Sequence, residues 1–203
     1  MLHQFAFYAA VVAAPFAIVA ADGTRASVTV AIFAFSVAAC FGASALYHRV
    51  TWSPRVRPWM RRVDHAGVYL LIAGTYTPVS LLALEGAWQT VILTTVWVGA
   101  GAAIVLKFAW VDAPKWLAAA IGLALGWVAI VALPHLVSRI DLTAVVLLVV
   151  GGIAYTVGAL VYAFRRPNPF PAVFGYHELF HALTLVAVAC QYTAITFFVA
   201  QTS

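Results

Sequence analysis

The residues with the most specific chemistry in this sequence are two histidines four positions apart, in the segment His177-Glu178-Leu179-Phe180-His181. On a helix, such residues differ by about 40° in azimuth and about 6 Å in height, so both imidazoles can reach one metal ion. The segment also matches the H-E-x-x-H pattern of zinc peptidases, in which Glu178 would be the general base. A peptidase embedded in a membrane needs a third ligand, commonly an aspartate in a later helix, and no aspartate follows His181. The peptidase pattern is therefore interpreted as a coincidence.

The composition indicates where these histidines must lie. Of the 203 residues, 65% are hydrophobic and 8% are charged, and the mean hydropathy is +1.02. A soluble domain of this composition could not cover its surface with polar groups. The chain is therefore predicted to be embedded in a lipid bilayer, with membrane lipids as its partners, and no nucleic-acid partner is needed to explain its positive charge.

Seven apolar runs are each long enough, or nearly so, to cross about 30 Å of hydrocarbon as a helix. They lack the alternating polar pattern of a membrane barrel, so helices are the expected way to satisfy their backbone groups in lipid. The first run is expected to be a span and not a signal peptide, because no lysine or arginine precedes it. We predict an all-α integral membrane protein, a seven-transmembrane helix bundle in a single domain 1–203, with spans at residues 5–21, 26–47, 63–84, 88–106, 115–133, 142–164 and 176–200.

The basic residues predict the orientation of the bundle. Nine of the eleven lysines and arginines fall on links at one end of the predicted spans, and only Arg25 and Arg139 fall at the other. Because cytoplasmic links carry the excess of basic residues, the N-terminus is predicted to be cytoplasmic and the C-terminus external. The nine are Arg49, Arg55, Arg57, Arg61, Arg62, Lys107, Lys115, Arg165 and Arg166.

Four ionisable residues converge at the cytoplasmic ends of three predicted spans: His48, Asp64, His177 and His181. Three neutral imidazoles and a water complete an open tetrahedral zinc site, so we expect His48, His177 and His181 to bind Zn²⁺. Asp64 could hold that water or orient a ligand imidazole. The simpler alternatives are histidines that only meet the membrane interface, and a salt bridge from Asp64 to a neighbouring arginine, Arg61 or Arg62.

The sequence also predicts where four other polar residues lie relative to this site. Ser44 lies one helical turn deeper than His48 and could hydrogen-bond the metal-bound water or a substrate oxygen; back-bonding to a helix carbonyl is an equal alternative. His65 is rotated by about 100° from Asp64 on an ideal helix, so we expect it to face elsewhere. His3, at the terminus, and His135, in a proline-containing external link, are expected at the wrong ends for the site.

Two helix faces predict an apolar cavity below the site. The face of Asp64 continues through Val68, Leu71, Thr75 and Pro78, and the face of His181 continues through Leu185, Val188 and Tyr192. Such faces suit an acyl chain lying below a polar head group. Helix packing without a ligand would look similar.

Three motifs give the chain a resemblance to a known family. They resemble, in order and spacing, the hemolysin III family, the bacterial branch of the progestin and adipoQ receptors, within a wider group of membrane hydrolases that includes alkaline ceramidases. The motifs are Ser44-Ala45-Leu46-Tyr47-His48, Arg62-Val63-Asp64-His65 leading into residues 69–78, and His177-Glu178-Leu179-Phe180-His181.

The resemblance implies a seven-helix bundle with a cytoplasmic N-terminus. It implies zinc bound by His48, His177 and His181, a water held by Asp64, and a motif serine at Ser44. The wider group often has a glutamate upstream of that serine, and the first two runs here contain none.

The function expected from these residues is hydrolysis of an amide- or ester-linked membrane lipid, with Asp64 helping to deprotonate a zinc-activated water. The alternative is a non-catalytic regulator or receptor-like protein in which the zinc is structural. The family name implies a weaker alternative, a membrane-lytic hemolysin.

Overall fold

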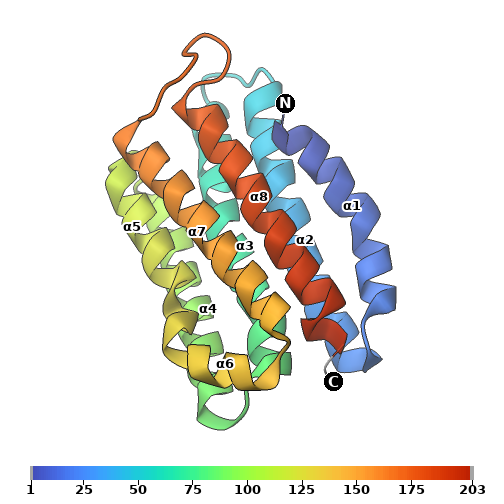
Figure 1. Ribbon diagram of the computed structural model, residues 1–203. Coiled ribbons are helices and arrows are strands. Elements are labelled where there is room, and N and C mark those ends of the chain that lie inside the picture. The colour runs from blue at the N-terminus through green and yellow to red at the C-terminus, as the bar shows by residue number, and fades with distance from the viewer. Residues whose placement is uncertain (1, 202–203) are drawn as a thin grey trace.

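The computed structural model describes residues 2–201 as a bundle of long helices that run between two ends, with the N-terminus at one end and the C-terminus at the other (Figure 1). Seven helical segments are long and apolar enough to cross a membrane. The predicted seven-helix class is confirmed. The helices are α1 Leu2–Ala20, α2 Gly23–Arg49, α3 Arg57–Ala83, α4 Gly86–Ala109, α5 Lys115–Gly126, α6 Leu133–Arg139, α7 Leu142–Phe164 and α8 Tyr176–Phe197.

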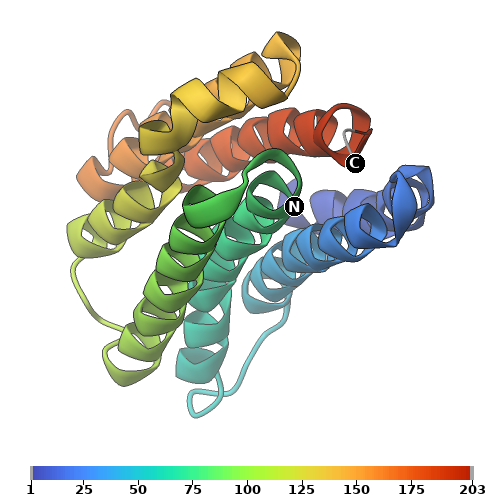
Figure 2. The same ribbon diagram turned by 90° about the horizontal axis from the view of Figure 1, so that it is seen from below.

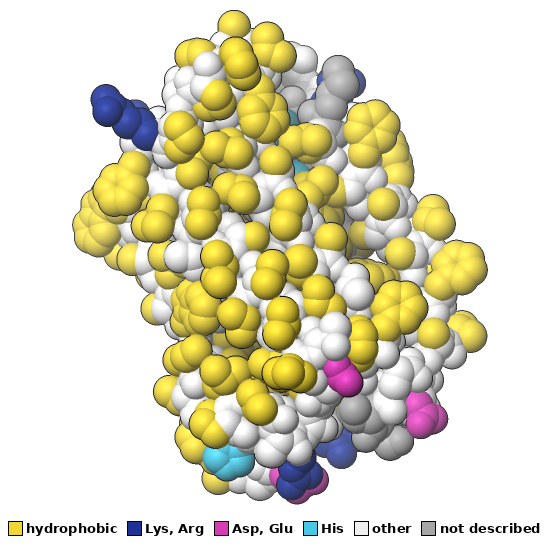
Figure 3. Space-filling model, viewed as in Figure 1, with side chains coloured by type: hydrophobic (Ala, Val, Ile, Leu, Met, Phe, Trp, Pro, Cys, Tyr) yellow, Lys and Arg dark blue, Asp and Glu magenta, His cyan; other side chains and the backbone are white. Residues whose placement is uncertain are grey.

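The outer surface of the bundle matches a lipid environment. Large apolar side chains such as Phe16, Val19 and Phe35 are exposed on the outside of their helices. Figure 3 shows hydrophobic side chains over most of the height of one face, with charged side chains near its two ends. Exposing such a continuous apolar surface to water would be unfavourable, and the seven apolar helices are long enough to span a bilayer, so the chain is a multi-pass membrane protein.

Small residues let the inner helices approach closely. A Cβ at Gly74 of α3 would lie 2.1 Å from Ser36 Oγ of α2, and a Cβ at Gly151 of α7 would lie 3.1 Å from the Ala187 carbonyl oxygen of α8. Close backbone approach at small residues is how helices gain packing energy in lipid. Of the seven spans, α3 is the most enclosed, and it contacts α2, α4, α5 and α8. The core therefore forms around α3 (Figure 2).

The fifth span differs from the continuous helix predicted at 115–133. After α5 the chain forms a 3₁₀ turn at Val128–Ala132 and then α6. Pro134 lies in the first turn of α6, where a missing N–H is tolerated, so it marks the start of that helix and does not cause the break at Trp127. The Tyr76 hydroxyl pairs with two backbone groups at the break: it donates to the Gly126 carbonyl at 2.7 Å and accepts from the Ala129 N–H at 3.0 Å. Irregular backbone is tolerated at membrane depth when protein groups satisfy it in this way.

The two ends of the bundle carry different charges. The N-terminus and the links at 50–56, 110–114 and 165–175 lie at one end, which we call the basic end (Figure 1). At the opposite end Arg139 donates to Glu85, with Nη2 2.7 Å from Oε2. These hydrogen bonds hold the pKa of the Glu85 carboxyl below its usual range. The charge distribution that predicts a cytoplasmic N-terminus is thus preserved in the folded bundle.

Candidate metal centre

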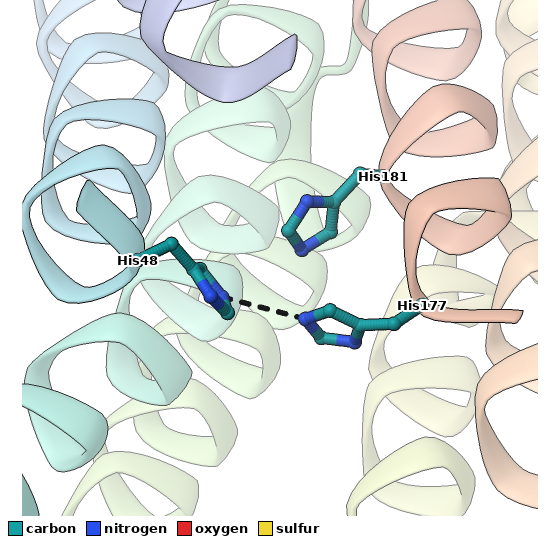
Figure 4. A group of neighbouring side chains, drawn as sticks. All are labelled: His48, His177 and His181. Atoms are coloured by element: carbon teal, nitrogen blue, oxygen red, sulfur yellow. Dashed lines mark hydrogen bonds between the residues drawn. The ribbon is translucent and has the colours of Figure 1, made fainter. Parts of the chain in front are cut away.

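Three histidines converge at the basic end. The ligand nitrogens of His48, His177 and His181 all lie within 4.8 Å of one another, and Nε2 of His48 lies 3.3 Å from Nε2 of His177. Figure 4 shows the imidazole of His48 reaching from α2 toward the two imidazoles carried by α8. The predicted ligand residues thus gather from two helices that are far apart in sequence.

Local structure fixes each side of this group. Helix α2 ends just after His48, where the Trp52 indole donates to the Leu46 carbonyl at 3.0 Å. Helix α8 begins one residue before His177, and Glu178 Oε2 caps its start by accepting from Gly175 N–H at 3.0 Å. Because Glu178 is held in this cap, it has a structural role at the start of α8. That geometry agrees with treating the zinc-peptidase pattern as a coincidence.

The three imidazoles fit a zinc ion in type and in spacing. Zinc binds neutral imidazole nitrogen at about 2.0–2.1 Å, so two ligands at a tetrahedral angle lie about 3.3 Å apart. The observed 3.3 Å between the Nε2 atoms of His48 and His177 matches that separation. The set contains no fourth protein ligand among the described residues. Three ligands leave a position for water or substrate, which is the composition of open zinc sites.

His3 lies at this centre, and the prediction that it lies at the wrong end is wrong. Its Nδ1 is 2.8 Å from Ser44 Oγ, and its ring stacks on His181 with centroids 3.9 Å apart and an interplanar angle of 16°. The cause is simple: α1 starts at the basic end and packs against α2 and α8. A cytoplasmic N-terminus already implied that placement.

Ser44 joins His3 to Asp64. No back-bond from Ser44 to a helix carbonyl occurs among the described contacts; its hydroxyl faces His3 Nδ1, and the Asp64 carboxyl interacts with the same hydroxyl. A serine hydroxyl has one proton. If it donates to an ionised Asp64, His3 must carry its proton on Nδ1 and donate to Ser44, which leaves His3 Nε2 as a lone-pair nitrogen. That Nε2 is buried and has no hydrogen-bond partner in residues 2–201.

Asp64 is not used in a salt bridge. The alternative pairing with Arg61 or Arg62 does not occur, because Arg61 pairs with Asp112 and Arg62 Nε donates to the Phe108 carbonyl at 2.9 Å. Asp64 instead lines the same cavity as the three histidines. A carboxylate in this position is free to act on a bound molecule.

A cavity of about 640 Å³ extends from the histidines into the bundle. Its wall includes Val68 and Thr75 of the predicted α3 face, but on α8 it is formed by Thr184 and Gln191, while Val188 packs in the core. The volume is in the range of ligand sites. A cavity does lie beside the two predicted helix faces, but several charged side chains line its wall, and Leu185, Val188 and Tyr192 do not line it.

Of the two remaining histidines, His65 lies at the cavity, against expectation, and His135 lies away from it, as expected. The expectation that His65 faces elsewhere is wrong: it lines the cavity, and its Nδ1 is buried without a partner among residues 2–201. The cavity is wide enough that two residues 100° apart on α3 both reach it. His135 does lie away from the site, on α6, with its ring 5.1 Å from that of Trp88.

Comparison with known proteins shows the family of the chain. The family model described as "Haemolysin-III related" matches residues 1–192. The chain belongs to the haemolysin III family. This family is related to the progestin and adipoQ receptors. The match includes every residue of the three-histidine group as well as Ser44 and Asp64.

Two haemolysin III relatives are from Bacillus species. The chain is 31% identical over 171 residues to "Hemolysin-3 homolog" of Bacillus subtilis (strain 168), covering 84% of this chain and 77% of that protein. It is 31% identical over 160 residues to "Hemolysin-3" of Bacillus cereus, covering 79% of this chain and 70% of that protein. The similarity thus extends over most of the length of each relative.

Proposed function

We propose that this haemolysin III family protein hydrolyses an amide- or ester-linked membrane lipid at a zinc site formed by His48, His177 and His181. One observation carries the proposal. The three ligand nitrogens lie within 4.8 Å of one another at the mouth of an apolar cavity that Asp64 also lines. A metal site, a carboxylate and an acyl-sized cavity together suit cleavage next to a lipid head group.

The metal and the cavity have separate tasks. A zinc ion in such a site supplies Lewis-acid chemistry, polarising a carbonyl oxygen and acidifying water. The cavity holds the acyl chain and keeps bulk water from the reacting carbonyl, which strengthens the electrostatic interactions there. The histidines line the same cavity, so a zinc ion held by them would lie beside a carbonyl bound there.

Asp64 and Ser44 handle the proton in this proposal. A carboxylate oxygen of Asp64 accepts the proton of the attacking water and later returns it to the leaving amine or alcohol. The Ser44 hydroxyl donates to Asp64 in the resting state and can turn to donate to a substrate oxygen. His3, 2.8 Å from Ser44, holds that hydroxyl in place. His3 is thus a positioning residue that acts through Ser44.

The expected location is the bacterial cytoplasmic membrane, with the basic end in the cytoplasm. The excess of lysine and arginine at this end supports the orientation. The substrate head group would then lie in the cytoplasmic leaflet.

The test compares lipid composition in cells that express Asp64→Asn and wild type at equal abundance. An amide cannot accept the proton, so turnover should fall by about 10²- to 10⁴-fold while zinc is retained. Asp141→Asn is the matched control, because Asp141 is an exposed N-cap at α7 and asparagine caps equally well. A lipid profile that is the same for Asp64→Asn and wild type would contradict hydrolysis.

A structural zinc in a non-catalytic regulator is the second candidate. It is favoured by the origin of the ligands, because His48 on α2 and His177 and His181 on α8 would be tied together by one ion. In that case removal of a ligand histidine lowers the melting temperature, and Asp64→Asn behaves as wild type. The two candidates therefore differ in the response to Asp64→Asn.

A further inference from the structure

The wall of the cavity contains a buried cation that forms no ion pair among the described residues. Lys107, in the last turn of α4, lines the cavity and is only 4% exposed. Among residues 2–201 no carboxylate lies within ion-pair distance of its ammonium, and no hydrogen bond from it is formed. A lysine at such a depth is costly unless an opposite charge compensates it. The site therefore calls for an anion that the chain itself does not supply.

Two neighbours of Lys107 also have unused donors. Arg61 Nε and His65 Nδ1 are buried atoms without hydrogen-bond partners in the described chain. Lys107 interacts electrostatically with both Arg61 and His65, so the three side chains share one region of the cavity wall. Two unpartnered nitrogens beside a buried ammonium that forms no ion pair suit the binding of an anion.

The nearby acid is already used. Asp112 is exposed and forms an ion pair with Arg61; it also attracts the Lys107 ammonium, but not from ion-pair distance. On the other side, Lys115 donates to the Tyr176 hydroxyl at 2.9 Å and lies over the rings of Tyr162 and Tyr176 at 4.5 and 4.8 Å. Lys115 adds positive charge at the mouth without pairing with a carboxylate. The balance of charge at this wall is therefore positive.

We propose that Lys107, Arg61 and His65 bind the carboxylate or phosphate of an anionic amphiphile whose acyl chain lies in the apolar part of the cavity. The apolar part is reached from the same opening, past Val68 and Ile72 to Trp127. An oxyanion would accept hydrogen bonds from the three side chains. The acyl chain would occupy the apolar part of the cavity, where water is unfavourable. As a statement about substrate, this rests on the proposed function and narrows it to anionic lipids; binding itself requires no turnover.

The experiment measures binding of two fluorescent chains to the full-length protein in detergent. The probes are cis-parinaric acid and the uncharged alcohol with the same chain, detected by energy transfer from tryptophan. Wild type should bind the acid at least about tenfold more tightly than the alcohol, because a buried charge pair is worth at least that factor. Lys107→Met should remove this preference while leaving alcohol binding unchanged. Arg55→Met is the control, since Arg55 is exposed at the same end and does not line the cavity.

Three results would overturn the inference. Equal loss in Lys107→Met and Arg55→Met would mean general surface charge, and loss in His177→Ala with retention in Lys107→Met would mean that the acid binds at the histidines. Displacement of the acid by inorganic phosphate as effectively as by lysophosphatidate would mean a site for free anions. Failure of hydrolysis does not affect these readouts, because Asp64→Asn should retain the full preference for the acid.

Discussion

His3 Nδ1 lies 2.8 Å from Ser44 Oγ, so the first turn of α1 is joined to α2 directly beside the three-histidine group. The same His3 ring stacks on His181, one of the candidate metal ligands. One side chain thus contacts both Ser44, the proposed proton-handling group, and His181, a candidate ligand. Helix α1 is less buried than every other span except the fifth. His3 anchors its first turn at the site.

Two substitutions of His3 separate its two contacts. His3→Ala removes both, and zinc affinity should fall by about tenfold, since groups that orient a metal ligand typically contribute 10- to 100-fold. His3→Phe keeps a ring against His181 but cannot bond to Ser44, so its zinc affinity should remain closer to wild type while lipid turnover falls. Competition with a chromogenic zinc chelator measures the affinities. Wild-type affinity in His3→Ala would show that the stack does not orient His181.

The Tyr76 hydroxyl is predicted to stabilise the break in the fifth span. Tyr76→Phe leaves the Gly126 carbonyl and the Ala129 N–H without their partner, and each buried unsatisfied group costs about 1–3 kcal/mol. Tyr155→Phe is the matched control, because the Tyr155 hydroxyl is buried without a partner in residues 2–201. Unfolding in mixed detergent should show a loss for Tyr76→Phe and little change for Tyr155→Phe. Equal stability of the two variants would contradict this role.

Two glycines, Gly74 in α3 and Gly101 in α4, give stability predictions of opposite sign. Gly74→Ala places a Cβ 2.1 Å from Ser36 Oγ, and overpacking of this kind costs about 1–3 kcal/mol. Gly101→Ala meets nothing within 4 Å, so alanine should be neutral or stabilise α4 by up to about 1 kcal/mol. Thermal unfolding of the two purified variants measures both. A stable Gly74→Ala protein would mean that α2 and α3 are less tightly packed than described.

The orientation in the membrane predicts the result of reporter fusions. A reporter inserted at Arg57, in the basic end, should report the cytoplasm, and one fused after residue 203 should report the exterior, because basic links remain inside. Alkaline phosphatase and green fluorescent protein are suitable paired reporters. Two fusions on the same side would mean an even number of spans between those points.

The sequence predicted the helical class and the gathering of His48, His177 and His181, because both depend on local or additive signals. Apolar length alone indicates seven spans, and the four-residue spacing of His177 and His181 indicates a shared helix face. His48 followed from the basic residues, since the same end of the bundle is basic and carries the ligands. These inferences need no knowledge of which helices are neighbours.

The errors arose where helix neighbours decide the outcome. His3 was placed at the wrong end, although the predicted cytoplasmic N-terminus was sufficient to correct it. The stack on His181 could not be predicted, because it requires α1 to pack beside α8. His65 reaches the cavity because the space beside α3 is broad, and the break near Trp127 depends on the Tyr76 hydroxyl, 50 residues away in sequence. Such features depend on tertiary packing, which local patterns do not encode.

The most direct test of the candidate site is the zinc content of purified protein from cells grown with zinc. The wild type should contain close to one zinc per chain, and His48→Ala, His177→Ala and His181→Ala should each lose most of it, because two ligands make a poor site. His135→Ala is the control, since His135 contacts Trp88 on α4 and lies away from the three-histidine group. Zinc that stays stoichiometric in the three ligand variants, or a wild type without zinc, would contradict the metal centre.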